Sequence, residues 1–237
     1  MAKLLVSVRS EAEARAASRA GAAIVDVKDP ARGSLGMASC TVWRQVRAAV
    51  PRSVDVSVAL GELNDWLGPE RVNLPPGCWE GIAFRKLGLA NAGSSWREHW
   101  RDLRATMDGA PSSGKPGGCP SWVAVVYLDW EAARSPEPEH VIAEAADNGD
   151  CRGILFDTWD KSRRVELDSK AFCWIGGAKE SGRLVALAGS LNEAAIRRLR
   201  SLEPDVFAVR GAACRGGDRH APIDTERVAR LVEAVGD

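Results

Sequence analysis

The sequence predicts an α/β protein that folds as a single-domain (β/α)8 barrel, or TIM barrel, over residues 1–237. Short apolar runs rich in valine, isoleucine and leucine alternate with longer segments of helical character. The alternation occurs eight times and resumes in step after each glycine- or proline-rich stretch. This pattern is typical of parallel β-α-β units, and eight such units close into a barrel. An open doubly wound sheet is the alternative, but the evenness of the repeat favours closure.

The predicted strands are the apolar runs, whose β-branched residues favour extended backbone. They cover residues 4–8, 23–27, 54–60, 82–87, 122–128, 153–156, 184–188 and 206–209.

The predicted helices follow the runs and carry start and stop signals. Ser10, with Glu13 three residues later, has the pattern of a capping box, and Pro51 ends the second helix. Two segments do not fit the pattern of a helix after each strand. Residues 61–77 contain paired prolines, so we expect an irregular crossover there, and the glycine-rich residues 108–120 are expected to form a flexible loop. The helices are expected at residues 10–21, 40–50, 95–107, 138–148, 169–181, 192–202 and 224–235.

Charge and cysteine content narrow the function classes. The chain has 32 basic and 32 acidic residues, so it lacks the general basic field of a nucleic-acid-binding protein. The N-terminal apolar run is too short for a signal sequence or a membrane span, so we expect a cytoplasmic protein without a membrane partner. The six cysteines form no C-x-x-C pair, so we expect free thiols and no metal site.

Lysines and aspartates gather where predicted strands end. In a (β/α)8 barrel the active site lies at the carboxyl ends of the strands. A lysine amine that loses its proton can attack a carbonyl carbon to form a Schiff base, and nearby carboxylates can move protons. On chemistry alone each of the three lysines is a candidate nucleophile; the alternative is that the Asp–Lys pairs only neutralise one another. The residues are Asp26, Lys28, Lys86, Asp157 and Lys161.

The last two strands end in small residues that suit phosphate. Backbone N–H groups after these strands often bind phosphate in barrel enzymes, and small side chains allow close approach. Arg215 and Arg219 add positive charge beyond the last strand. The alternative is ordinary turn chemistry. The candidate phosphate-binding residues are Gly189, Ser190, Arg210, Gly211, Ala212 and Ala213.

These segments together resemble the (5-formylfuran-3-yl)methyl phosphate synthase family, whose members are also called 4-(hydroxymethyl)-2-furancarboxaldehyde-phosphate synthases. The resemblance covers nearly the whole chain, and its specific parts follow the second and eighth strands. It rests on residues 4–7, 26–30, 33–36, 86–89, 157–158, 186–190 and 209–219.

The resemblance implies an enzyme that joins two molecules of glyceraldehyde 3-phosphate, with loss of phosphate and water, as a step toward methanofuran-type carriers. It implies that Lys28 is the Schiff-base lysine and that no metal or organic cofactor is needed. Asp26, Lys86, Asp157 and Lys161 match the supporting catalytic residues of the family.

The chain departs from the family pattern in its middle segment, residues 61–120, and between Asp157 and Lys161, where Trp159 and Asp160 stand. These departures affect the expected identity of the substrate more than the expected Schiff-base chemistry. The alternatives are another barrel aldolase or isomerase acting on a sugar phosphate, and a non-enzymatic sensor of a phosphorylated ligand. The partner expected from these features is a small triose phosphate; a homo-oligomer is compatible with them.

Overall fold

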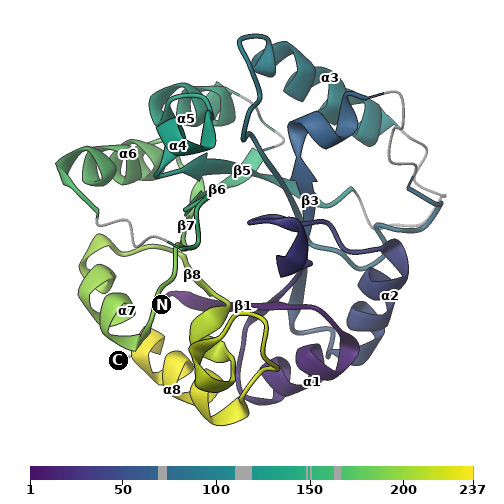
Figure 1. Cartoon of the computed structure of the whole chain (residues 1–237), viewed down its shortest axis with the longest axis vertical. Coiled ribbons are helices and arrows are strands. Elements are labelled where there is room, and N and C mark those ends of the chain that lie inside the picture. Colours follow the sequence, from purple (N-terminus) through teal and green to yellow (C-terminus); the bar gives the residue numbers. More distant parts are fainter. Residues whose placement is uncertain (69–73, 110–118, 148, 150, 163–166, 237) are drawn as a thin grey trace.

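The computed structural model describes residues 1–68, 74–109, 119–147, 149, 151–162 and 167–236. Its parallel strands form a closed barrel in sequence order, with β8 returning to pair with β1 (Figure 1). The barrel prediction is confirmed, and each predicted apolar run overlaps one strand. The strands are β1 (Lys3–Val8), β2 (Ile24–Val27), β3 (Asp55–Glu62), β4 (Phe84–Gly88), β5 (Ser121–Tyr127), β6 (Cys151–Asp157), β7 (Leu184–Leu187) and β8 (Val206–Val209).

The helices surround the barrel, and one connection differs from the others. Between β3 and β4 the described residues form a 3-10 helix, Leu63–Trp66, in the segment where paired prolines predict an irregular crossover. The predicted flexible loop at 108–120 lies mostly outside the described residues. No helix in the described part of the chain is long and apolar enough to cross a membrane. The α-helices are α1 (Glu11–Arg19), α2 (Cys40–Ala49), α3 (Trp96–Gly109), α4 (Trp130–Ala133), α5 (Pro138–Asp147), α6 (Ser169–Glu180), α7 (Glu193–Leu199) and α8 (Thr225–Gly236).

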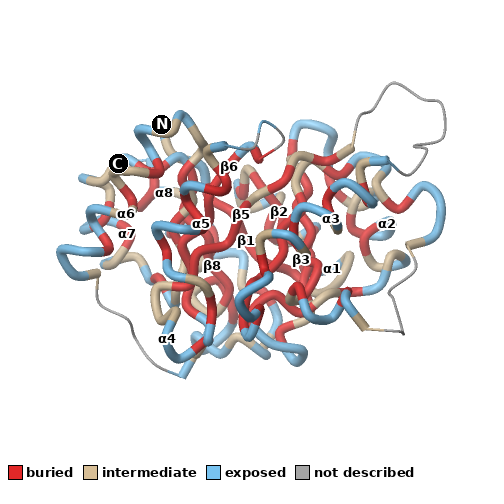
Figure 2. The backbone as a smooth tube through the Cα atoms, turned by 90° about the horizontal axis from the view of Figure 1, so that it is seen from above, coloured by how far each residue is buried: buried red, intermediate tan, exposed pale blue. Residues whose placement is uncertain are grey.

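Side chains alternate across each strand, which separates two apolar layers. In β1, Leu4 and Val6 pack in the layer between barrel and helices, whereas Leu5 packs inside the barrel. Figure 2 shows the buried residues concentrated along the strands and the inner faces of the helices. The same alternation turns Asp26 inward from β2, as the sequence predicts.

The helix caps follow the sequence, with one change that affects the site. The Ser10 side chain accepts the Glu13 N–H at 3.3 Å, and Asn192 caps α7 in the same way. The Glu13 carboxylate does not complete the predicted capping box. It accepts hydrogen bonds from the Arg9 N–H at 2.9 Å and from the Arg210 guanidinium at 2.6 Å.

The expectation of free thiols is wrong for two of the cysteines. Cys40, at the start of α2, and Cys78, in the β3–β4 connection, form a disulfide with Cα atoms 5.7 Å apart. The two residues are 38 positions apart in sequence, and only the packing of this connection against α2 brings them together. Spacing alone therefore carries no signal for the pair.

Arg85 lies next to Lys86 in β4 but points outward, where it is buried between two tryptophans. Its guanidinium carbon is 5.1 Å from the Trp79 ring centroid and 4.1 Å from that of Trp122. The guanidinium also forms an ion pair with Asp108 at the end of α3. Cation–π contacts and a partly buried ion pair together fix this part of the helix layer on the sheet.

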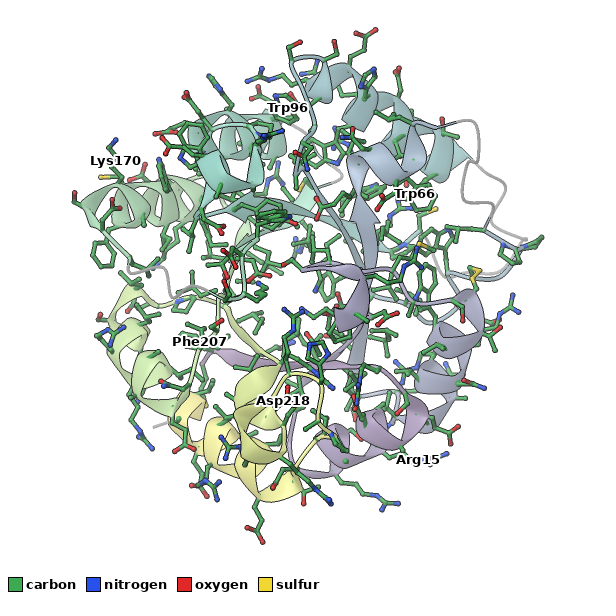
Figure 3. All side chains as sticks on the ribbon, viewed as in Figure 1. Arg15, Trp66, Trp96, Lys170, Phe207 and Asp218 are labelled. Carbon is green, nitrogen blue, oxygen red and sulfur yellow. A yellow bond between two sulfur atoms is a disulfide. The ribbon has the colours of Figure 1, made fainter. Side chains whose placement is uncertain are left out.

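We expect Arg85→Ala to lower the free energy of unfolding by about 3 kcal/mol, because it leaves a cavity between the two tryptophans and removes the cation that pairs with the Asp108 carboxylate. Chemical denaturation followed by tryptophan fluorescence measures the change. The matched control is Arg15→Ala. Arg15 lies at the outer rim of the ring in Figure 3 and pairs with Glu11 at 2.7 Å in an exposed i,i+4 geometry. That variant is expected to lose less than about 0.5 kcal/mol, and equal losses in both variants would contradict the role of Arg85.

Candidate active site

A pocket of about 520 Å³ opens at the carboxyl ends of the strands. Its floor is made by inward side chains of the barrel, and its walls come from the loops after β2, β6, β7 and β8. The structure brings to this pocket every candidate residue except Ala213, which is buried in the layer between barrel and helices. The candidates that line it are Asp26, Lys28, Lys86, Asp157, Lys161, Gly189, Ser190, Arg210, Gly211 and Ala212.

Lys28 follows β2 directly, and the strand's alternation turns it inward. It is 7% exposed, and its ammonium nitrogen donates a hydrogen bond to the Ser34 carbonyl oxygen at 3.2 Å. Burial lowers the pKa of Lys28 to about 8. Asp157 and Asp26 oppose this shift, while the ammonium groups of Lys161 and Lys86 add to it.

We expect the amine of Lys28 to react with acetic anhydride along a titration curve centred near pH 8, because only the neutral amine is nucleophilic. Mass spectrometry of the Lys28 peptide after trace acetylation across a pH series measures this curve. In the chain unfolded by denaturant the same curve should move up to the ordinary lysine value of 10.5. Identical curves in the two states would show that the fold does not activate Lys28.

Asp157 ends β6 and lies between two lysines. Although burial would raise its pKa, the ammonium groups of Lys161 and Lys28 hold the pKa of Asp157 below its ordinary value. Lys161 forms an ion pair with one carboxylate oxygen, and the Ser34 hydroxyl donates to the other at 3.3 Å. Ser34 therefore links the loop after β2 to Asp157 while its carbonyl oxygen accepts from Lys28.

Asp26 and Lys86 form a second ion pair deeper in the barrel. Their side chains are 1% and 5% exposed, and the Lys86 nitrogen is 2.6 Å from an Asp26 oxygen. The Ser7 hydroxyl donates to the other Asp26 oxygen at 3.1 Å. Both charges act on the amine of Lys28: Asp26 raises its pKa and Lys86 lowers it.

The β7 and β8 loops present small residues to the pocket. Gly189 has φ +95°, and a Cβ there would lie 3.1 Å from a Thr158 methyl carbon, so the position requires glycine on both counts. Ser190 also has positive φ, at 57°. Gly211 begins a short 3-10 helix after β8, next to the backbone of Gly217.

Arg210 lines this end of the pocket, but its guanidinium is already engaged. It binds the Glu13 carboxylate at 2.6 and 3.1 Å and donates to the Ser7 carbonyl oxygen at 2.9 Å. It also donates to the carbonyl oxygens of Arg219 and Ala221 on the β8 loop. The side chain that the sequence offers for phosphate thus fastens the loop to α1.

Two other arginines supply positive charge, and one of them lacks a signal in the sequence. Arg219, expected as a rim cation, lines the pocket and donates to the Gly33 carbonyl oxygen at 3.4 Å. Arg227, in the first turn of α8, also lines the pocket and donates to the Ala212 carbonyl oxygen at 2.9 Å. Arg215, the other expected rim cation, is exposed and does not line the pocket.

A hydrogen-bonded pair outside the pocket, the buried Tyr127 and the partly buried Glu62, has shifted pKa values but no predicted role. The Tyr127 hydroxyl donates to the Glu62 carboxylate at 2.6 Å, and the Ala90 N–H donates to the other oxygen at 2.8 Å. Burial raises the pKa of both Glu62 and Tyr127. Both residues stand at strand ends in the sequence, but their contact across 65 positions is visible only in the fold.

Comparison with known proteins identifies the family of this chain. A model of the family described as 4-HFC-P synthase matches residues 4–232. The (5-formylfuran-3-yl)methyl phosphate synthase of Methanothermobacter thermautotrophicus is 32% identical over 235 residues, which cover 97% of each chain. This chain belongs to the 4-HFC-P synthase family.

Further relatives span nearly full length. The (5-formylfuran-3-yl)methyl phosphate synthase of Methanopyrus kandleri is 32% identical over 238 residues, 98% of each chain. A protein of Methylorubrum extorquens is 32% identical over 238 residues, which cover 98% of this chain and 91% of that protein.

Solved structures support the barrel fold of this chain. A phosphoribosylanthranilate isomerase of Thermotoga maritima superposes with a TM-score of 0.61 at 14% identity, covering 100% of this chain and 99% of that chain. A thiamine phosphate pyrophosphorylase of Pyrococcus furiosus gives 0.60 at 15% identity, covering 99% and 95%. At this identity the likeness shows the barrel fold alone.

Proposed function

We propose that this chain is a (5-formylfuran-3-yl)methyl phosphate synthase that joins two molecules of glyceraldehyde 3-phosphate through a Schiff base on Lys28. The observation that carries the proposal is the state of Lys28. It is a buried amine with a pKa lowered to about 8, at the mouth of a barrel whose family makes this furan. Lowering the pKa increases the fraction of neutral amine near physiological pH, and the neutral amine is the form that attacks a carbonyl carbon.

In the proposed reaction, the Lys28 nitrogen attacks the carbonyl carbon of one triose phosphate, and loss of water gives the Schiff base. Removal of the proton at C2 and loss of phosphate from C3 gives an enol, whose C3 carbon attacks the C2 carbonyl of the second triose phosphate after proton transfer has converted that molecule into its ketose isomer. The C1 hydroxyl of the second triose closes the ring on the former C2 of the first, loss of two waters forms the furan, and hydrolysis of the Schiff base releases the aldehyde and the amine of Lys28. No oxidant or reductant is needed, because every step is a condensation, a proton transfer or an elimination.

The carboxylate of Asp157 is our candidate for moving protons during these steps. It is ionised because two ammonium groups hold its pKa low, and it lies within charge contact of Lys28. Lys161 shares this carboxylate and can return the proton as the carbinolamine loses water. Asp26 and Lys86, deeper in the barrel, fix the electrostatic field under the amine.

Phosphate groups are proposed to bind at the opposite side of the pocket. The backbone around Gly189, Ser190, Gly211 and Ala212 lines that side, and Arg227 contributes positive charge. Backbone N–H groups and a nearby guanidinium suit a phosphate dianion. Arg210 contributes by holding the β8 loop in place rather than by donating to phosphate.

Incubation with glyceraldehyde 3-phosphate alone tests the function. Ultraviolet absorbance of the furan aldehyde and release of inorganic phosphate are expected to rise together. Carbon–carbon condensation without release of phosphate, or isomerisation without furan absorbance, would indicate another barrel enzyme. Saturable binding without either product would indicate a ligand sensor.

A further inference from the structure

The position of Lys161 depends on a loop rather than on a strand. Asp157 is the last residue of β6, and Lys161 lies four residues further on, in the connection to α6. Its ammonium nitrogen contacts Asp157 and lies 3.4 Å from the Thr158 hydroxyl. These contacts persist only if the intervening peptide units keep their path.

Asp129, two residues after β5, binds that path directly. One carboxylate oxygen accepts the Trp159 N–H at 2.7 Å, and the other accepts the Asp160 N–H at 2.8 Å. Both bonds are charge-assisted, and together they hold two consecutive amides. Alongside them, the Leu128 N–H donates to the Asp157 carbonyl oxygen at 2.8 Å, so the ends of β5 and β6 stay in register.

The Asp129 carboxylate does not make the hydrogen bond that is usual at its position in the chain. It occupies the N-cap position of α4, where an aspartate side chain ordinarily accepts an N–H from the helix's first turn. In this structure it makes no such bond to α4. The carboxylate is turned instead toward the neighbouring loop, so α4 lacks a stabilising side-chain cap.

We propose that Asp129 is a positioning residue whose carboxylate clamps the loop after β6 and thereby holds Lys161 against Asp157. The inference rests on the proposed function of the site, and it adds a residue that touches neither substrate nor the reacting amine. Asp160 completes the clamped turn by accepting the N–H and hydroxyl of Ser162 at 2.9 and 2.6 Å.

Release of the clamp has a predictable electrostatic consequence at Lys28. The charged groups around Lys28 are the carboxylates of Asp157 and Asp26, which raise its pKa, and the ammonium groups of Lys161 and Lys86, which lower it. If Lys161 leaves, a repelling cation is lost and Asp157 is freed to stabilise the Lys28 ammonium. Both effects raise the pKa of Lys28.

Asp129→Asn is the test variant, because it keeps the volume but replaces one acceptor oxygen by an amide that donates. With glyceraldehyde 3-phosphate we expect kcat to fall between about tenfold and 100-fold, with KM changed much less. The titration of Lys28 by trace acetylation, which needs no substrate, should move above pH 8.

The matched control is Asp168→Asn. Asp168 caps α6 in the same connection by accepting the Ala171 N–H at 2.8 Å, so the chemical change is identical but the clamp is untouched. Kinetics and the Lys28 titration should match those of the wild type. The variant Asp129→Glu, which keeps two acceptor oxygens, should recover most of kcat, and thermal melts of all variants establish that each is folded.

A double-mutant cycle with Lys161→Ala shows whether Asp129 acts through Lys161. In that background Asp129→Asn should add little to the loss in kcat or to the shift at Lys28. An unchanged Lys28 titration in the single variant, or an equal further loss in the double variant, would overturn the clamp. If the wild type makes no furan, the proposed function fails, whereas the acetylation series still decides the clamp.

Discussion

Replacing Lys28 by alanine is expected to reduce kcat by a factor on the order of 10^4 or more, as removal of a covalent nucleophile does in other enzymes. The physical reason is that no other amine in the described pocket combines burial with freedom from a direct carboxylate bond. Lys86 and Lys161 each form an ion pair with an aspartate, whereas Lys28 donates to the Ser34 carbonyl oxygen. Furan absorbance under saturating glyceraldehyde 3-phosphate measures the loss.

The control for this prediction is Lys28→Arg. Arginine keeps a positive charge at the same position, but its guanidinium stays protonated and cannot form a Schiff base. We therefore expect the arginine variant to be as inactive as the alanine variant. Substantial turnover by either one would mean that another residue carries the covalent intermediate.

Replacing Asp157 by asparagine is expected to lower kcat by between about 10²-fold and 10⁴-fold, the range associated with loss of a general acid–base group. The sign of the accompanying pH effect separates two explanations. Asp157 raises the pKa of Lys28, so its removal lowers that pKa and increases the neutral fraction of the amine at pH 7. If activity depended only on the neutral amine, the variant would be faster near neutrality.

The measurement is the pH dependence of kcat together with the acetylation curve of Lys28. We expect the acetylation curve to move to lower pH while kcat falls at every pH. An Asp157→Asn variant that keeps wild-type turnover, with or without the shift, would exclude a proton-transfer role for this carboxylate.

The inward strand residues of the site could be predicted from the sequence because they obey a two-residue period. Asp26 and Lys28 fall on one face of β2, and the barrel rule places that face at the mouth of the pocket. Lys86 follows from the same rule, although its neighbour Arg85 also stands near a strand end and points the other way. Charge alone does not separate the two; the alternation of β4 does.

The contacts made by loop residues of the site could not be predicted from the sequence. The sequence predicts that Arg210 lies near phosphate, but it does not predict that the Arg210 guanidinium binds Glu13, a contact between residues 197 positions apart. Arg227 was missed because it belongs to the first turn of a helix and carries no motif. Such contacts are set by how loops fold over the barrel end, which local periodicity does not encode.

The strand pattern and the family resemblance both bear on the prediction that Lys28 is the nucleophile, but they do not narrow the choice equally. The strand pattern leaves three lysines as candidates, and the family resemblance selects one. The structure adds a physical reason for the choice: Lys28 is the buried amine whose pKa is lowered to about 8, set between two neutralised ion pairs.

Trapping with borohydride tests the covalent role of Lys28 most directly. Reduction in the presence of glyceraldehyde 3-phosphate fixes a Schiff base as a stable amine that trypsin does not cleave. Unmodified protein gives peptides 20–28 and 29–32, so an adduct on Lys28 predicts one peptide, 20–32, carrying the mass of the reduced triose phosphate. An adduct on the peptide of Lys86 or Lys161, with 20–28 released unmodified, would contradict the assignment of Lys28 as the nucleophile.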